Sequence, residues 1–543
     1  MTPFNTKDNR KIPRVTAGPL VSMPIPDTTT SNGAAGFSYE NKSALFLLAT
    51  NSMFGQDKFY ESAKQADDRF VKLVREVAKA DPEWMFGFIG WLRNTGNMRT
   101  AAVVASVEAA LVLKNVPLVQ VAAGDQGWSR KLAKAGLGRA DEVGEAVAYY
   151  FSKYPNTQIP KPLKRGWADA MTELFNEYTA MKYGNSDKKE FTPDRLLNLL
   201  HPQAKAPWQS DLFGYLVARK YGEVEIPESL KMLRVRQIMM GWPVAERRSF
   251  LGEHEASDAL KSAGMTWEAL AGWLQGPMDA QAWQAIIPNM GYFALLRNLR
   301  NFDQAGIDAK TAAYVMGRLC DEQAVAKSKI FPFRFLAAHR NAPHSRWGGP
   351  LSMALDMSLK NIPTLPGRTL VLVDTSGSMG HAFSEHSEMK RRDAAALFGI
   401  ALAKAGNQVD LYSYASGYGK WLMEFKTTKG ADVLAEMASW QRLGYNIGGG
   451  TPTARAVQAT YKGHDRVVIL TDEQADYSGF RGVDAPVPAD KHFYTFNLAG
   501  YRQGHAPTGK FRHSFGGLTD ACFPLMSMIE EGTAGRWPWE VVA

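Results

Sequence analysis

The chain has 543 residues, of which 45% are hydrophobic and 22% are charged, and its formal net charge is +9. This length exceeds what one ordinary hydrophobic core serves, so at least two domains are expected, and the composition excludes a mainly disordered chain. The positive charge is compatible with nucleic acid, an anionic membrane or an acidic protein as partner, and equally with a surface that has no such partner.

Two features of the sequence favour a cytoplasmic protein. Cys320 and Cys522 are its two cysteines. Their spacing matches no metal or redox motif, so a disulfide scaffold is not expected and a reducing compartment fits. The first residues contain no apolar segment of the kind found in signal peptides, and no apolar run approaches the length of a membrane span.

In chain order, residues 1–32 are rich in Pro, Thr, Ser and Gly, which predicts an extended N-terminal arm. Residues 33–362 are predicted to be helical, because apolar residues recur there at helix spacing and breakers such as Asp81-Pro82 and Gly276-Pro277 interrupt them. Examples of that spacing are Phe70, Leu73, Val74 and Val77; Trp167, Met171, Leu174, Phe175 and Tyr178; and Trp267, Leu270, Ala271 and Leu274. Many short helices predict a HEAT-like α-solenoid, but no strict repeat is visible and an irregular helical bundle stays open.

The pattern changes after the linker at residues 363–367, so residues 363–543 form a second predicted domain. Strand-like runs alternate there with helical ones, which predicts a doubly wound, mostly parallel α/β sheet. The predicted strands are Thr369–Val373, Gln408–Tyr414, Trp421–Phe425, Arg466–Leu470 and His492–Leu498, and the predicted helices lie at Arg391–Ala405, Asp432–Ser439 and Thr453–Thr460.

Oxygen-bearing side chains follow three segments of this second domain. Asp374, Ser376 and Ser378 come directly after one predicted strand, Thr451 follows three glycines, and Asp472 ends another strand. Carboxylate and hydroxyl oxygens suit Mg²⁺ better than Zn²⁺, and such sheets bind ligands at the carboxyl ends of their strands. A simple turn is the alternative explanation for the first motif. The three segments together resemble the metal-ion-dependent adhesion site (MIDAS) of von Willebrand factor A domains.

The helical part carries a second resemblance. Residues 328–333 (SKIFPF), 266–270 (TWEAL), 294–299 (ALLRNL) and 194–202 (DRLLNLLHP) are similar to segments of the TROVE domain of the Ro autoantigen family, and the linker and VDTSGSM follow them in the order found there. The chain therefore resembles a bacterial-type Ro homologue. The resemblance implies a monomeric ring of helical repeats closed by a von Willebrand factor A domain.

The resemblance also implies RNA partners. A small structured Y-like RNA would bind the outer surface, single-stranded 3′ ends of misfolded RNA would enter the ring, and Y RNA could tether polynucleotide phosphorylase. The family's Y RNA contact falls on His201, with Lys182, Lys188, Lys189 and Arg195 nearby. A histidine before a proline is otherwise an ordinary helix end.

Two further basic groups are candidates for RNA contact. Lys161, Lys164 and Arg165 stand at a predicted helix start, where cations oppose the helix dipole unless an external anion compensates; a solvated surface explains them equally. Between residues 323 and 355 there is no acidic residue, and cations alternate with aromatic rings, as single-stranded RNA requires; the rings could instead belong to the core. The cations include Lys327, Lys329, Arg334 and Arg340, and the rings are Phe331, Phe333, Phe335 and Trp347.

No catalytic motif is visible: the sequence lacks a phosphate-binding P-loop, an HExxH helix and a GxSxG turn. We therefore expect a non-catalytic RNA-binding scaffold in RNA quality control, with Mg²⁺ as its cofactor. Two alternatives stay open. One is a metal-dependent adaptor that binds protein without RNA, for example as partner of an AAA+ ATPase; the other is a metal nuclease.

Overall fold

The computed structural model describes residues 28–29, 35–36, 41–51, 63–96, 98–115, 127–184, 190–342, 344–382, 389–417, 419–472, 483–498, 511–516, 522–533, 537 and 539. Contacts between residues divide the chain into two compact units. One unit comprises Val74–Arg318, and the other comprises Met1–Leu73 together with Leu319–Ala543. Among the described residues, no helix is long and apolar enough to cross a membrane.

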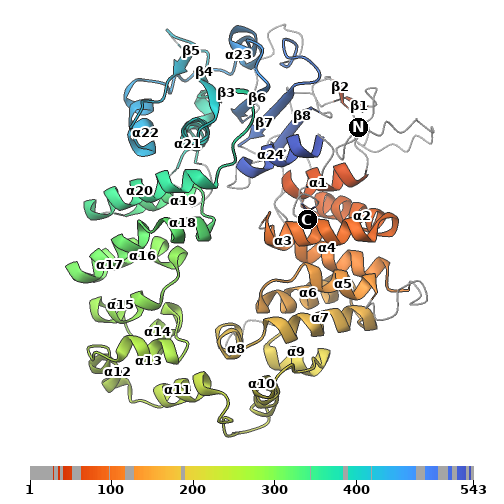
Figure 1. The fold of residues 1–543 in the computed structure, drawn as a ribbon, viewed down its shortest axis with the longest axis vertical. Coiled ribbons are helices and arrows are strands. Elements are labelled where there is room, and N and C mark those ends of the chain that lie inside the picture. Colours follow the sequence, from red (N-terminus) through yellow and green to blue (C-terminus); the bar gives the residue numbers. More distant parts are fainter. Residues whose placement is uncertain are drawn as a thin grey trace. The chain divides into compact units, whose positions relative to one another are not determined.

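The elements described in the Val74–Arg318 unit are helices (Figure 1). Their bounds are α2 Ala63–Ala80 (shared with the other unit), α3 Pro82–Asn94, α4 Arg99–Val112, α5 Trp128–Ala135, α6 Ala140–Lys153, α7 Lys161–Leu174, α8 Glu177–Gly184, α9 Pro193–Leu200, α10 Pro207–Ala218, α11 Lys231–Met240, α12 Val244–Phe250, α13 Ala256–Ser262, α14 Trp267–Leu274, α15 Ala280–Ile286, the 3₁₀ turn Ile287–Asn289, α16 Tyr292–Ala305 and α17 Ala309–Leu319 (the last residue in the other unit).

Local sequence sets these helix ends. Asp81 accepts a hydrogen bond from the Trp84 amide at 3.0 Å while Pro82 occupies the first helical position, so the predicted breaker is the start of α3. Thr266 caps α14 in the same way. The predicted helical run from Trp167 to Tyr178 is two helices, because Phe175 adopts extended backbone after α7.

Packing within this unit is local along the chain. The helix pairs with several contacts are near neighbours in sequence, such as α3 with α4, α5 with α7, and α13 with α15. Local contacts of this kind are what stacked helical repeats require. The helical character predicted for this region is confirmed.

The other unit contains helices and two sheets. The helices are α1 Asn41–Asn51, α18 Glu322–Ser328, α19 Pro332–Asn341, α20 Gly348–Ser358, α21 Arg391–Lys404, α22 Val433–Arg442, α23 Thr453–Thr460 and α24 Cys522–Thr533, with 3₁₀ turns at Ser345–Trp347, Leu359–Asn361 and Gly377–Gly380. The strands are β1 Thr28–Thr29, β2 Ala35–Gly36, β3 Arg368–Asp374, β4 Gln408–Tyr414, β5 Leu422–Phe425, β6 Arg466–Thr471, β7 His492–Asn497 and β8 Arg512–Gly516. Strand β1 of the predicted arm pairs antiparallel with β2, which lies just beyond the arm in the region predicted to be helical.

The larger sheet has the order β5-β4-β3-β6-β7-β8 (Figure 1). All of its neighbouring strands are parallel except the β4–β5 pair, so the prediction of a mostly parallel sheet is confirmed. Both faces of β3 are buried. Leu370 and Leu372 share a core with Val457 of α23, and Val371 lies against Gly399 of α21. Because successive side chains point to opposite faces, α21 and α23 cover opposite sides of the sheet.

Contacts tie helices α19 and α20 to the α/β region rather than to the helical unit. Phe333 packs against Phe523 of α24, with ring centroids 6.0 Å apart. Asp356 of α20 accepts a hydrogen bond from the first amide of α22, Val433, at 3.0 Å. The division by contacts thus falls near residue 318, whereas the predicted domain boundary lies between residues 362 and 363.

Candidate metal centre and nucleic-acid interface

The two predicted metal-binding carboxylates stand at the same edge of the sheet. Asp374 ends β3 and Asp472 directly follows β6, and these strands are parallel neighbours with Val373 opposite Leu470. Carboxyl ends of parallel strands meet at one edge. Both side chains are fully buried, at 0% exposure.

Hydrogen bonds hold the Asp374 carboxylate in place. Its Oδ1 accepts from the Ser376 amide at 2.8 Å, and its Oδ2 accepts from the Thr471 hydroxyl at 2.7 Å. Among the described residues, no cation forms an ion pair with it. Burial, with a smaller contribution from Asp472, raises the pKa of Asp374 to about 6 despite the two hydrogen bonds. A divalent cation would compensate this buried charge.

The glycine loop that carries Thr451 docks on the loop after β3. The Gly377 amide donates to the Gly449 carbonyl, and the Gly448 amide donates to the Thr375 carbonyl, both at 3.0 Å. Gly448 and Gly449 have φ of 80° and 92°, a region that favours glycine, and a Cβ on Gly449 would lie 2.6 Å from a backbone nitrogen. That nitrogen belongs to Gly417 after β4, so glycine at position 449 is required for the close approach of this loop to Ser416 and Gly417. Thr451, two residues further on, is buried.

The donor set fits a hard divalent cation. Ser376 and Ser378 place their hydroxyl oxygens 3.3 Å apart beside Asp374. Among the described residues, no group of three or more His, Cys, Asp or Glu side chains is placed to hold a metal. A cation here would thus depend on hydroxyl oxygens as well as carboxylates, a chemistry that suits Mg²⁺. The structure brings the loop after β3, the glycine loop and the end of β6 together, as the spacing predicts.

Sequence reasoning missed Arg391 beside this site. It is the first residue of α21, and its guanidinium Nη1 lies 3.8 Å from Asp472 Oδ2. The Arg391 side chain is 17% exposed, so its charge acts in a partly desolvated setting. These two residues are far apart in the sequence and meet only in the fold, so no local sequence pattern predicts the contact.

His201 lies on the surface at the end of α9. It is exposed and has left-handed backbone, with φ 52° and ψ 58°, and its amide donates to Leu197 at 3.0 Å. The predicted helix end is confirmed. The ring is therefore free of the core and accessible to a ligand.

The other residues predicted around His201 differ in their surroundings. Lys182 in α8 places its ammonium over the rings of Tyr178 and Tyr183, at 5.6 and 5.5 Å from their centroids. Arg195 donates to the Glu190 carbonyl at 2.7 Å. Lys188 and Lys189 lie outside the described residues.

The basic group at the start of α7 stays uncompensated. Lys161 and Arg165 are exposed and Lys164 is half-buried, and the first turn of α7 holds no acidic residue. None of the three forms an ion pair with any residue that the structure describes. These cations are available to an anion from outside.

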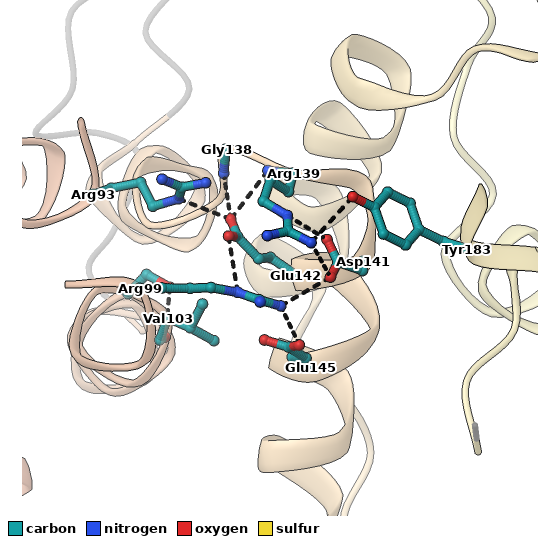
Figure 2. Close-up of polar contacts among 10 residues, drawn as sticks. Arg93, Arg99, Val103, Gly138, Arg139, Asp141, Glu142, Glu145 and Tyr183 are labelled. Atoms are coloured by element: carbon teal, nitrogen blue, oxygen red, sulfur yellow. Dashed lines mark hydrogen bonds and ion pairs between the residues drawn. The ribbon is translucent and has the colours of Figure 1, made fainter. Parts of the chain in front are cut away.

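In contrast to these cations, the arginines Arg93, Arg99 and Arg139 are all paired with carboxylates (Figure 2). Buried Glu142 accepts from Arg93 at 2.9 Å and pairs with Arg99 at 3.1 Å. Arg99 also pairs with Asp141 at 2.9 Å and with Glu145, and Arg139 pairs with Asp141 at 3.0 Å. Three arginines meet three carboxylates, so this network joins α3, α4 and α6 without surplus charge. Arg139 also donates to the Tyr183 hydroxyl at 3.1 Å, which connects α6 to α8.

The aromatic residues predicted to stack on RNA bases belong to the core instead. Phe333, Phe335 and Trp347 are 7%, 0% and 0% exposed, and Phe331 stacks on Phe523 with centroids 5.9 Å apart. The expectation that the buried rings contact bases is wrong. Burying these rings in the core is favoured by the hydrophobic effect. Helix periodicity by itself would also have placed them on the buried face.

The cations of this segment differ in exposure. Lys327 and Lys329 are exposed near the end of α18, and Arg334 is exposed on α19. Arg340 instead pairs with Asp393 of α21 at 3.0 Å, with side chains 22% and 9% exposed. The structure thus gives Arg340 a bridging contact between α19 and α21.

Residues 249–345 match the TROVE domain model. Telomerase protein component 1 of mouse is 25% identical over 403 residues, covering 62% of this chain and 14% of that protein, and its rat counterpart is 32% identical over 355 residues, covering 55% and 13%. The chain thus spans about one seventh of the length of these relatives.

One solved structure resembles the chain over most of its length. The crystal structure of the Deinococcus radiodurans Ro protein (RSR) superposes with a TM-score of 0.65 at 18% identity, covering 90% of this chain and 99% of that one. The fold is therefore shared, including helices followed by an α/β sheet. Its TROVE segment, its sequence relatives and its fold thus make the chain similar to proteins of the Ro family.

Proposed function

We propose that this protein is a non-catalytic RNA-binding scaffold that acts in RNA quality control or degradation. Similarity to a family known for RNA binding supports the general role. The observation that carries the proposal in this chain is the contrast between two groups of cations. The arginines of the Glu142 network are neutralised by carboxylates, whereas Lys161, Lys164 and Arg165 have no such partner among the described residues. Unneutralised cations on a helix surface are what phosphate groups require.

In this proposal a small structured Y-like RNA binds around α7, α8 and α9. His201 offers an exposed ring at the end of α9, Lys182 lies on α8, and Arg195 lies within α9. Lys188 and Lys189 remain candidates from sequence alone. A histidine ring can stack on an unpaired base and donate a hydrogen bond, while the lysines contact phosphates.

Single-stranded 3′ ends of misfolded RNA are the second proposed ligand. Exposed Lys327, Lys329 and Arg334 are the candidate phosphate contacts in the TROVE-matching segment. Arg340 is a weaker candidate, since it is already paired with Asp393. Closure of the helices into a monomeric ring, a cytoplasmic location and tethering of polynucleotide phosphorylase by the Y-like RNA are parts of the same proposal.

The α/β sheet is proposed to be a von Willebrand factor A-like domain that holds Mg²⁺ at an adhesion-type site. Ser376, Ser378 and Thr451 would supply hydroxyl oxygens, and Asp374 and Asp472 would bind directly or through water. A cation with few anionic ligands stays electrophilic and can accept a carboxylate from a protein partner. The site is thus a binding device in this proposal rather than a nuclease centre.

The test is to purify the protein from its native cell at low salt and to sequence any RNA that co-purifies. A discrete small RNA is expected, together with heterogeneous RNA fragments in smaller amount. Folded protein without enriched RNA would overturn the proposal and favour the adaptor without RNA. Mg²⁺-dependent loss of the RNA that Asp374→Ala abolishes would instead establish a nuclease.

A further inference from the structure

Helices α16 and α17 each display an aromatic ring on the surface. Phe293 of α16 is 43% exposed and Tyr314 of α17 is 41% exposed. The two helices are consecutive, and only Gly306, Ile307 and Asp308 connect them. Both lie within the segment that matches the TROVE domain.

Each exposed ring has an arginine beside it, one helical turn further along, and Arg318 also donates a hydrogen bond to the Tyr314 hydroxyl at 3.1 Å. The Arg297 guanidinium lies 5.6 Å from the Phe293 ring centroid, and the Arg318 guanidinium lies 6.0 Å from the Tyr314 centroid. The spacing of four residues puts ring and cation on the same helix face. The same arrangement thus occurs twice in succession.

Each of these two helix faces carries one more exposed cation. Arg300 follows Arg297 on α16, and Lys310 precedes Tyr314 by one turn on α17; both are exposed. Asp308 lies between the helices, but it is used locally, accepting a hydrogen bond from the Thr311 amide at 2.7 Å at the start of α17. The two exposed faces therefore present positive charge beside aromatic rings.

We propose that these two faces form a stacking surface for the unpaired bases of single-stranded RNA, which deepens the RNA-binding role proposed above and rests on it. A ring or a flat guanidinium stacks on any base regardless of sequence. Positive charge about 6 Å away, one helical turn, is then placed for the adjoining phosphates. Paired bases are stacked on each other already, so duplex RNA gains nothing from these rings.

A simpler role competes with this one. Exposed cation–aromatic pairs on a helix contribute a small local stabilisation without any ligand. The two roles differ in their consequences, because removal of the rings would in that case alter helix stability and leave RNA affinity unchanged.

The test compares binding of a fluorescent single-stranded oligouridylate with binding of a perfectly paired RNA hairpin, measured by anisotropy on the full-length chain. In Phe293→Ala/Tyr314→Ala, affinity for the oligouridylate should fall by about fivefold or more for each ring, while hairpin affinity changes by less than about twofold. Arg297→Lys/Arg318→Lys keeps the charge and removes the flat surface, so an intermediate decrease is expected. Tyr221→Ala is the matched control, since Tyr221 is 77% exposed and lies on neither face.

Circular dichroism of each variant is the control for correct folding. Unchanged oligouridylate affinity in the double ring variant, with wild-type protein binding both RNAs, would overturn this inference and leave the RNA-binding function intact. Equal weakening of oligouridylate and hairpin binding would also overturn it, because stacking on unpaired bases would not be the cause. Wild-type protein that binds neither RNA would overturn both proposals.

Discussion

The Glu142 network and the Asp374 site bury carboxylates in opposite ways. Glu142 is enclosed by Arg93, Arg99 and two backbone amides. Asp374, equally buried, accepts hydrogen bonds from one amide and one hydroxyl, and its pKa is raised to about 6 by burial. A carboxylate neutralised within the protein stabilises the fold, whereas one left without a cation is suited to binding one.

The largest effect is expected from breaking the neutralised network. Glu142→Ala leaves Arg93 and Arg99 partly buried without their shared partner, and should lower the free energy of local opening by about 3–5 kcal/mol. Hydrogen exchange of the amides of α3, α4 and α6 measures this directly.

Glu145→Ala is the matched control for that experiment. Glu145 belongs to the same network but is 50% exposed, so its removal should cost about 1 kcal/mol or less. Equal effects of the two substitutions would show that the buried Glu142 contributes no more to stability than the exposed Glu145.

The Asp374 site should respond to metal instead. Mg²⁺ at about one hundred times its dissociation constant should stabilise the α/β sheet by about 2.7 kcal/mol, seen as a rise in its thermal midpoint that EDTA reverses. Asp374→Asn removes the charge at nearly constant size and should abolish this rise.

Asp410→Asn is the control for the metal experiment. Asp410 lies in β4 and is paired with Arg368 and His464 at 2.7 and 2.8 Å, away from the proposed ligands. Its variant should keep the Mg²⁺ response even if its basal stability falls. A Mg²⁺ response that survives in Asp374→Asn would refute the assignment of the metal centre.

A smaller effect is predicted for pH. His513 on β8 is 4% exposed, and burial holds its pKa well below the usual value of 6.5. His492 and Tyr494 on β7 stack beside it, and the charges of His492 and Arg512 further disfavour its protonation. Below pH 6.5 the histidine therefore binds a proton in the unfolded chain but stays neutral in the folded chain. The free energy of unfolding consequently falls as the pH falls from 6.5 toward the pKa of the folded state.

Between pH 7.5 and 5.5 the protonation of this one group in the unfolded chain should lower the free energy of unfolding by on the order of 1 kcal/mol. In urea unfolding of the α/β sheet, His513→Phe should lose that much less stability than wild type over the same pH interval. Parallel pH dependence of the two proteins would show that His513 is not the responsible group.

Much of the fold could be predicted from the sequence because its strands are short apolar runs with clear breaks. The predicted strand at Gln408–Tyr414 matches β4 residue for residue. Strand β8 and helix α24 were missed. Arg512–Gly516 begins with an arginine and a histidine, which are typical of a loop, and Pro524 in α24 resembles a helix breaker although it occupies the first turn, where proline is tolerated.

The candidate site was predictable in part for the same physical reason. Asp374, Asp472 and Thr451 follow strand ends and glycines, so local sequence places them at one sheet edge. Arg391 beside Asp472 and Arg340 beside Asp393 depend on tertiary packing, which no local pattern encodes. Exposed and buried aromatic residues, such as Phe293 and Phe335, likewise look alike in sequence and differ only in the fold.

Salt dependence of binding shows most directly whether the uncompensated cations at the start of α7 contact RNA phosphates. The affinity of the co-purified small RNA should be titrated between about 50 and about 200 mM salt, for wild type and for the Lys161→Gln/Lys164→Gln/Arg165→Gln variant. We expect affinity to fall steeply with salt for wild type. For the variant, the slope of log affinity against log salt should be shallower by about 0.7–0.9 for each phosphate that it no longer neutralises. Identical slopes, or wild-type binding that salt does not weaken, would contradict this expectation.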